Sequence, residues 1–168
     1  MDYKIDIENK MKHSSINVPD NSEIIEKFVD KNQDKQIVVV QGLGFVGSVM
    51  SLVCANAVNG DYAVIGVDVP NARGEKIIND LNKGIFPIVA EDPKIEQFYK
   101  KALKKKNFLA TSNVGAYKYA DVIIVDINLD VEKNNTNLGA LNDFNIDLRF
   151  FKNAIKSIGE NCKNNTLI

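Results

Sequence analysis

The chain has 168 residues, of which 45% are hydrophobic and 26% charged, and its formal net charge is −1. This length and composition suit one globular domain with a core, and the near-zero charge excludes a general attraction to nucleic acid or anionic lipid. No apolar run is long enough to span a membrane, and the first residues lack a signal-peptide pattern. We therefore expect a cytoplasmic protein with no nucleic-acid or membrane partner.

Residues 1–35 are mostly polar and carry no glycine-rich motif, and we interpret them as an N-terminal extension. Ser22 suits the N-cap of a short amphipathic helix over residues 23–30. Such a helix would contact the main domain or a partner, and a flexible tail is the alternative. The single histidine, His13, lies in this extension and is interpreted as a surface residue rather than a base or ligand.

From residue 36 onward, short apolar strands alternate with helical segments. Strands are predicted at 37–40, 63–67, 108–111 and 121–125 because these runs are rich in β-branched residues or apolar throughout. Helices are predicted at 48–58, at 72–82, after Pro93 and at 146–159. The Asn- and Asp-rich stretch 129–144 is predicted to be loop, and 166–168 the start of a fifth strand. This alternation predicts an α/β domain over 36–168 with a doubly wound, mainly parallel sheet.

A glycine motif follows the first predicted strand directly and opens the next helix. Its glycines are Gly42, Gly44 and Gly47, and Asp68 ends the second strand 21 positions after Gly47. This is the arrangement of a Rossmann dinucleotide-binding unit. There the first glycine permits a tight turn, the second lets the backbone approach the pyrophosphate, and the third lets helix and strand lie close together.

The cofactor predicted from this arrangement is NAD. The N-terminus of the helix offers free N–H groups and a positive dipole end to the phosphates. Asp68 can accept hydrogen bonds from the adenosine ribose hydroxyls. A 2′-phosphate would be repelled by that carboxylate, so we expect NAD rather than NADP. The alternative interpretation is a glycine-rich turn in an α/β domain without a ligand.

Four segments together resemble the nucleotide-sugar dehydrogenases of the UDP-glucose 6-dehydrogenase type. They are GLGFVG at 42–47, Asp68 with Arg73 five positions later, LNKGIFPI at 81–88 and ADVII at 120–124. The LN-G-PI element is the most specific of these. One departure follows the fourth strand, where the family often has a VPTP-like segment and this chain has Ile-Asn-Leu-Asp at 127–130. Whether Asp126 or Asn128 replaces the family's threonine contact is left open.

The resemblance implies an NAD-dependent oxidoreductase of polysaccharide biosynthesis. It would oxidise the C6 alcohol of a nucleotide sugar to a carboxylate in two hydride transfers to NAD, as a homo-oligomer. The implied cofactor-binding residues are Gly42, Gly44, Phe45, Val46, Gly47, Asp68 and Arg73.

The family's nucleophilic cysteine lies in a later GGxCxxKD-like segment, which this sequence lacks, so we expect an NAD-binding part without catalytic residues. Cys54 and Cys162 show no disulfide, zinc or nucleophile pattern, and no metal site is expected. The alternatives are a dehydrogenase of the 6-phosphogluconate type and a regulatory NAD-binding module without chemistry. The LN-G-PI element argues against the first of these, and a longer parent sequence with the cysteine segment would exclude the second.

Overall fold

A parallel sheet of four strands organises the chain, and the computed structural model describes residues 21–89, 91–129, 131–135 and 141–168. The strands follow the order β3-β2-β1-β4, with all neighbouring pairs parallel. Their bounds are β1 Gln36–Gln41, β2 Tyr62–Val67, β3 Phe108–Thr111 and β4 Val122–Val125. The four strands predicted from the sequence are thus present within a residue at each end.

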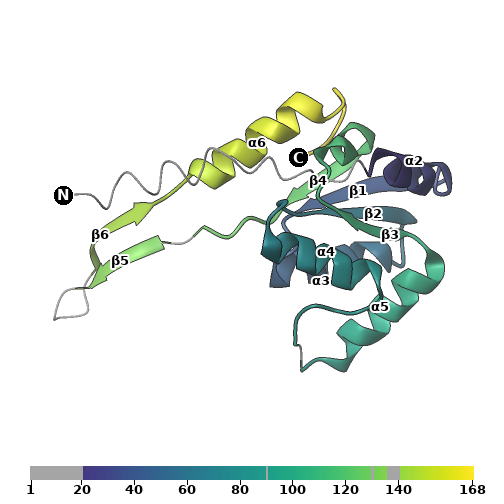
Figure 1. Cartoon of the computed structure of the whole chain (residues 1–168), viewed down its shortest axis with the longest axis horizontal. Helices are drawn as coiled ribbons and strands as arrows, with labels where there is room; N and C mark the ends of the chain where they lie inside the picture. The colour runs from purple at the N-terminus through teal and green to yellow at the C-terminus, as the bar shows by residue number, and fades with distance from the viewer. Residues whose placement is uncertain (1–20, 90, 130, 136–140) are drawn as a thin grey trace.

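Helices cover both faces of this sheet (Figure 1). One face carries α3 (Phe45–Ala55), α4 (Ala72–Asn82) and α5 (Pro93–Lys105). The other carries α2 (Ser22–Asp30), the 3-10 helix η1 (Val114–Tyr119) and α6 (Arg149–Asn161). This arrangement confirms the predicted α/β class with a doubly wound parallel sheet.

Alternating side chains of the central strands pack into two separate hydrophobic cores, one on each face of the sheet. Val38 and Val40 of β1 lie in the core under α3, α4 and α5, whereas Ile37 and Val39 lie in the core under α2 and α6. Val39 and Val40 are both fully buried. Burial of such a side chain contributes about 1.5–3 kcal/mol, so the β-branched run of β1 stabilises both halves of the domain.

Helix α2 packs on the second core through Ile25, which is 1% exposed. The predicted helix is therefore present, but its predicted N-cap is wrong. The helix includes Ser22, and its N-cap is Asn21. The Ser22 hydroxyl instead accepts a hydrogen bond of 3.3 Å from the side-chain amide of Asn113 at the start of η1. Residues 1–20, with His13, lie outside the described residues.

Helix α3 begins and ends three residues earlier than the predicted 48–58. It starts directly after Gly44, whose extended backbone breaks the turn, so that Gly47 lies inside the first helical turn. At the other end the Asn56 side-chain amide donates to the carbonyls of Leu52 and Phe98, 2.9 Å in each case. The first bond satisfies a carbonyl in the last turn of α3, and the second ties this helix end to α5, so that the helix ends before the predicted Asn-Gly stop.

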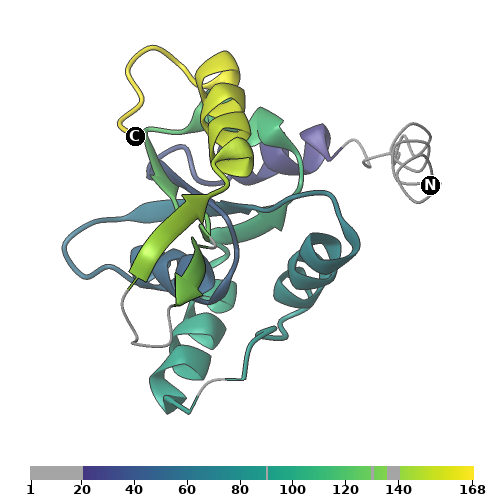
Figure 2. The ribbon, with the colours of Figure 1, turned by 90° about the vertical axis from the view of Figure 1, so that its left-hand side faces the viewer.

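The prediction of loop over 129–144 is wrong, because two antiparallel strands occur there. Strand β5 (Val131–Asn135) pairs with β6 (Leu141–Ile146), from Val131 opposite Ile146 onward. A ladder of this kind uses backbone groups, so a polar composition does not prevent it. Figures 1 and 2 show this hairpin as an arm beyond the carboxyl end of β4, joined through β6 to α6.

Helix α6 starts at Arg149 rather than at the predicted 146. The Asp147 carboxylate accepts the Arg149 backbone N–H at 3.0 Å and pairs with its guanidinium at 2.6 Å. The predicted fifth strand is seen as a parallel bridge between Leu167 and Val122 at the outer edge of β4. Among the helices of the described ranges, none is long and apolar enough to cross a membrane.

Candidate functional site

A tight glycine loop connects the carboxyl end of β1 to helix α3. Gly42 has a φ of +94°, a conformation that residues with a Cβ rarely adopt, and its N–H donates to the Val67 carbonyl at 2.8 Å. A Cβ at Gly42 would stand 1.9 Å from the backbone oxygen of Asp126, which follows β4. Both the turn and the approach of the β4 end therefore require glycine at position 42.

The other two glycines of the motif differ in what surrounds them. A Cβ at Gly47 would stand 1.9 Å from the Gly42 carbonyl oxygen, so the first turn of α3 lies directly against the loop. A Cβ at Gly44 would meet nothing within 4 Å. The protein itself thus has no steric need for glycine at position 44. The open space there fits a ligand whose phosphates approach the backbone closely.

The N-terminus of α3 faces the same space. Its N-cap is Gly44, which has no side chain to cap the helix, and the first turn contains no acidic residue. The first backbone bond back to the loop is Ser48 N–H to the Gly44 carbonyl, at 3.0 Å. The N–H groups ahead of it have no partner within an α-helix, which makes this end suited to an anion. Phe45 and Val46, the predicted contact residues between the glycines, are 54% and 57% exposed.

Asp68 lies at the end of β2 beside this loop, as predicted. One carboxylate oxygen accepts the Leu43 N–H at 3.0 Å, and the other accepts the N–H of Val69 at 2.7 Å. Leu43 itself is fully buried and lies over Gly66, where a Cβ would come within 2.6 Å of its side chain. These bonds fix the orientation of the carboxylate. An ionised carboxylate has about four acceptor positions, so the half-buried Asp68 retains capacity for ribose hydroxyls.

Arg73 is exposed in the first turn of α4, next to the Asp68 end of the loop. Its neighbour Gly74 is close to this site, because a Cβ there would stand 2.1 Å from the Val69 carbonyl and 3.5 Å from the Asp68 carboxylate. The Gly74 N–H is capped by the Asn71 side chain at 2.9 Å. The first turn of α4, which contains Arg73, therefore lies on the Asp68 side of the glycine loop.

Asp126 stands on the opposite side of the loop. Its N–H donates to the Gln41 carbonyl at 2.8 Å, which continues the pairing of β4 with β1. Its carboxylate oxygen Oδ2 would be 2.9 Å from a Cβ at Gly47. The sequence left open whether Asp126 lies near the cofactor or has a structural role. The structure places it at the carboxyl end of β4, beside the glycine loop.

The LN-G-PI segment has a structural function in this chain. The side-chain amide of Asn82 bonds to Ala110 of β3, and Gly84 has a φ of +85°. The hydroxyl of buried Tyr99 donates to the carbonyl of Leu81, and burial raises the pKa of this tyrosine to about 12. The segment therefore joins α4, α5 and the edge strand, and none of these contacts points to a cofactor.

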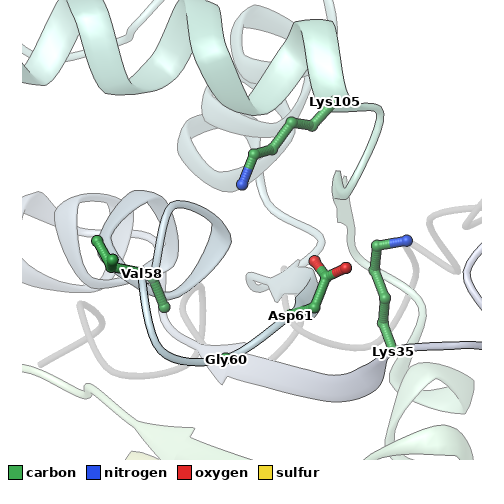
Figure 3. A pocket seen from close by; sticks show the side chains of 6 residues that line it. Lys35, Val58, Gly60, Asp61 and Lys105 are labelled. Atoms are coloured by element: carbon green, nitrogen blue, oxygen red, sulfur yellow. The ribbon is translucent and has the colours of Figure 1, made fainter.

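A separate pocket lies at the amino ends of the strands, at the opposite end of the sheet from the glycine loop (Figure 3). Its lining includes Lys35 just before β1, Asp61 just before β2, and Lys105 at the end of α5. Ligands of open parallel sheets bind beyond the carboxyl ends of the strands, where the glycine loop lies, and this pocket is at the amino ends. We therefore assign the candidate site to the glycine loop.

Cysteine and metal chemistry have no support in the described ranges. Cys54 is half-buried within α3, and burial raises the pKa of its thiol, which disfavours the reactive thiolate. Cys162 follows α6, on the other face of the sheet from α3. Within the described residues no group of three or more His, Cys, Asp or Glu side chains is placed to hold a metal ion.

Three solved nucleotide-sugar dehydrogenases share the fold of this chain. The NDP-N-acetyl-D-galactosaminuronic acid dehydrogenase of Methanosarcina mazei Go1 superposes with a TM-score of 0.65 and 22% identity, over 85% of this chain and 28% of that one. UDP-D-ManNAc dehydrogenase of Pyrococcus horikoshii superposes with a TM-score of 0.59 and 22% identity, over 79% of this chain and 27% of that one. For GDP-mannose dehydrogenase of Pseudomonas aeruginosa the TM-score is 0.54 and the identity 24%, over 73% of this chain and 24% of that one. These likenesses show the shared fold, and the chain spans about a quarter of their length.

Sequence comparison identifies the family. No curated protein sequence shows a significant match to this chain. The family profile described as UDP-glucose/GDP-mannose dehydrogenase family, NAD binding domain, matches residues 35–168. This match confirms the resemblance and the NAD cofactor predicted from the sequence. The chain therefore belongs to the UDP-glucose/GDP-mannose dehydrogenase family and carries its NAD-binding domain.

Proposed function

We propose that this chain is the NAD-binding part of a nucleotide-sugar 6-dehydrogenase. Such an enzyme oxidises the C6 alcohol of the sugar to a carboxylate, and NAD, when bound, supplies the hydride acceptor. The observation that carries the proposal is the open space at Gly44, where a Cβ would meet nothing within 4 Å, at the uncapped N-terminus of α3. The family match and the three solved dehydrogenases support the reaction class.

In this proposal the residues around the glycine loop hold different parts of the cofactor. The backbone N–H groups of Phe45, Val46 and Gly47 bind the pyrophosphate, because they lie in the unpaired first turn of α3. Gly42 provides the turn that aims this helix end outward. We assign the adenosine ribose hydroxyls to Asp68, with Arg73 along the adenosine on the same side.

Calorimetric titration of the chain with NAD tests the binding proposal directly. We expect one NAD per chain and no binding by a Gly44→Val variant that unfolds at the same temperature as the unaltered chain. The valine would fill the space proposed for the pyrophosphate. Absence of NAD binding by the unaltered chain would contradict the proposal, as would unchanged affinity in a folded Gly44→Val variant.

The reaction itself calls for a separate experiment. Oxidation to a carboxylate needs a thiol that holds the aldehyde, and neither Cys54 nor Cys162 has the pattern of such a nucleophile. We propose that the nucleophilic cysteine, and the residues that contact the sugar, lie outside the NAD-binding domain. The chain mixed with NAD and a panel of UDP- and GDP-sugars should then give no steady rise in NADH absorbance. NADH production that disappears on substitution of Cys54 or Cys162 would place the nucleophile within this chain instead.

A further inference from the structure

Two carboxylates flank the glycine loop, one from each side. Asp68, after β2, accepts the Leu43 N–H at 3.0 Å. Asp126, after β4, has its backbone oxygen against Gly42 and its carboxylate oxygen 2.9 Å from where a Cβ of Gly47 would stand. The proposed binding of NAD uses only the first of these acids. The second is half-buried at the same edge of the sheet.

The strand order decides which half of a dinucleotide each acid would face. The order β3-β2-β1-β4 reverses direction at β1, so the crevice at the carboxyl ends lies between the β1–β2 side and the β4 side. A dinucleotide extends across such a crevice with its pyrophosphate at the N-terminus of the first helix. If Asp68 faces the adenosine ribose, the other nucleoside extends from α3 toward the end of β4, where Asp126 stands.

We infer that Asp126 makes this site prefer the oxidised over the reduced nicotinamide cofactor. The inference rests on the proposed function, because it requires NAD in the glycine-loop crevice. The oxidised nicotinamide ring carries one positive charge and the reduced ring none, while the rest of the molecule is the same. The carboxylate lies beside the first turn of α3 and repels the pyrophosphate of both forms alike, so only its attraction to the charged ring distinguishes the oxidised from the reduced form. With partial screening by solvent, this attraction corresponds to about a three- to tenfold difference in affinity.

The test compares dissociation constants of NAD⁺ and NADH for the chain and for an Asp126→Asn variant. This substitution keeps the size and shape of the side chain and removes its charge. The expected result is a three- to tenfold fall in the ratio Kd(NADH)/Kd(NAD⁺), because repulsion of the pyrophosphate is common to both forms and cancels in the ratio. Asp61→Asn is the matched control. It removes the same charge from an exposed residue at the opposite edge of the sheet, and it should leave the ratio unchanged.

A second measurement on the unaltered chain keeps the inference testable if Asp126→Asn does not fold. The Kd ratio should fall as sodium chloride is raised, toward the ratio expected for Asp126→Asn, because salt screens the attraction between carboxylate and ring. An unchanged ratio in folded Asp126→Asn, or a ratio insensitive to salt, would overturn the inference while NAD binding itself still stood. Binding of neither cofactor form by the unaltered chain would overturn both the inference and the proposed function.

Discussion

The side-chain amide of Asn82 makes both backbone hydrogen bonds of Ala110. Its nitrogen donates to the Ala110 carbonyl at 2.7 Å, and its oxygen accepts the Ala110 N–H at 2.9 Å. Ala110 belongs to β3, which has no further strand on its outer side within the described sheet. The amide thus occupies the place of a neighbouring strand and satisfies an edge that would otherwise be unpaired.

Replacement of Asn82 by alanine should lower the free energy of unfolding by about 2 kcal/mol, because it leaves two backbone groups of the buried Ala110 without partners. Urea denaturation measures this difference. Asn79→Ala on the exposed face of the same helix is the control and should change stability by less than about 0.5 kcal/mol. Equal effects of the two substitutions would show that the bonds to Ala110 contribute nothing.

Gly44 and Gly47 should respond in opposite ways to added side chains. Gly44→Val should leave the unfolding temperature nearly unchanged but remove measurable NAD binding, which is a loss of at least about a hundredfold, or about 2.7 kcal/mol. Gly47→Ala should destabilise the fold itself, because its Cβ would stand 1.9 Å from a backbone oxygen. Thermal unfolding and NAD titration of both variants check this contrast. A Gly44→Val variant as unstable as Gly47→Ala would assign both glycines to folding alone.

Asp68 should select NAD over NADP by about tenfold. The 2′-phosphate carries about −1.5 to −2 charges, and even a third of the repulsion of about 4 kcal/mol between unit charges 4 Å apart gives that factor. Asp68→Asn should reduce the preference while it keeps an acceptor for the Leu43 N–H. Calorimetric titration with NAD and with NADP measures this preference in the chain and in the variant. NADP binding as tight as NAD binding in the unaltered chain would rule out this role for Asp68.

Asp121 should make stability depend on pH. Burial opposes its ionisation, but the Lys163 ammonium at 2.6 Å and the Ile37 N–H at 2.8 Å outweigh it and lower the pKa of the carboxyl below its usual 3.8. Because the folded-state pKa is the lower one, the stabilisation is complete above the unfolded value and is lost as pH falls through the folded value.

The difference in unfolding free energy between the chain and Asp121→Asn should therefore be largest near about pH 6 and shrink below about pH 4. Urea unfolding at several pH values measures it. Lys163→Met is the matched variant, since it removes the ion pair and keeps the Ile37 bond; its effect should be smaller, because the pair is partly exposed. A difference that stays constant down to about pH 2 would refute the assignment.

The sequence allowed the sheet and the glycine loop to be predicted, because both depend on local patterns. The β-branched run before Gly42 and the spacing to Asp68 are sufficient to place a strand, a turn and an acid at one edge. The start of α3 was misplaced because the glycines suggested loop. The helix begins at Phe45, directly after the extended Gly44, so Gly47 lies within its first turn, and the absence of a Cβ there allows the close packing that the motif predicted.

Other features could not be predicted because they depend on distant partners. The β5–β6 hairpin forms from a polar stretch whose pairing is between backbone groups. Asn82 looked like part of a family signature, and only the fold shows that it reaches Ala110, 28 positions away in sequence. The position of Asp126 at the carboxyl edge was one of two possibilities in the sequence, but its contacts with Gly42 and Gly47 come only from the pairing of β4 with β1, which joins residues more than eighty positions apart.

The interlocking of Gly42, Gly47 and Asp126 has a consequence for the energetics of ligand capture. Each of the two glycines has a backbone oxygen where its Cβ would be, so the turn, the helix end and the end of β4 cannot shift separately. A cradle held in this way is preorganised, and a ligand that enters it loses little affinity to ordering of the protein. Amide hydrogen exchange at Gly42 and Leu43, whose N–H groups bond to Val67 and Asp68, should accordingly be slow even before any cofactor is added.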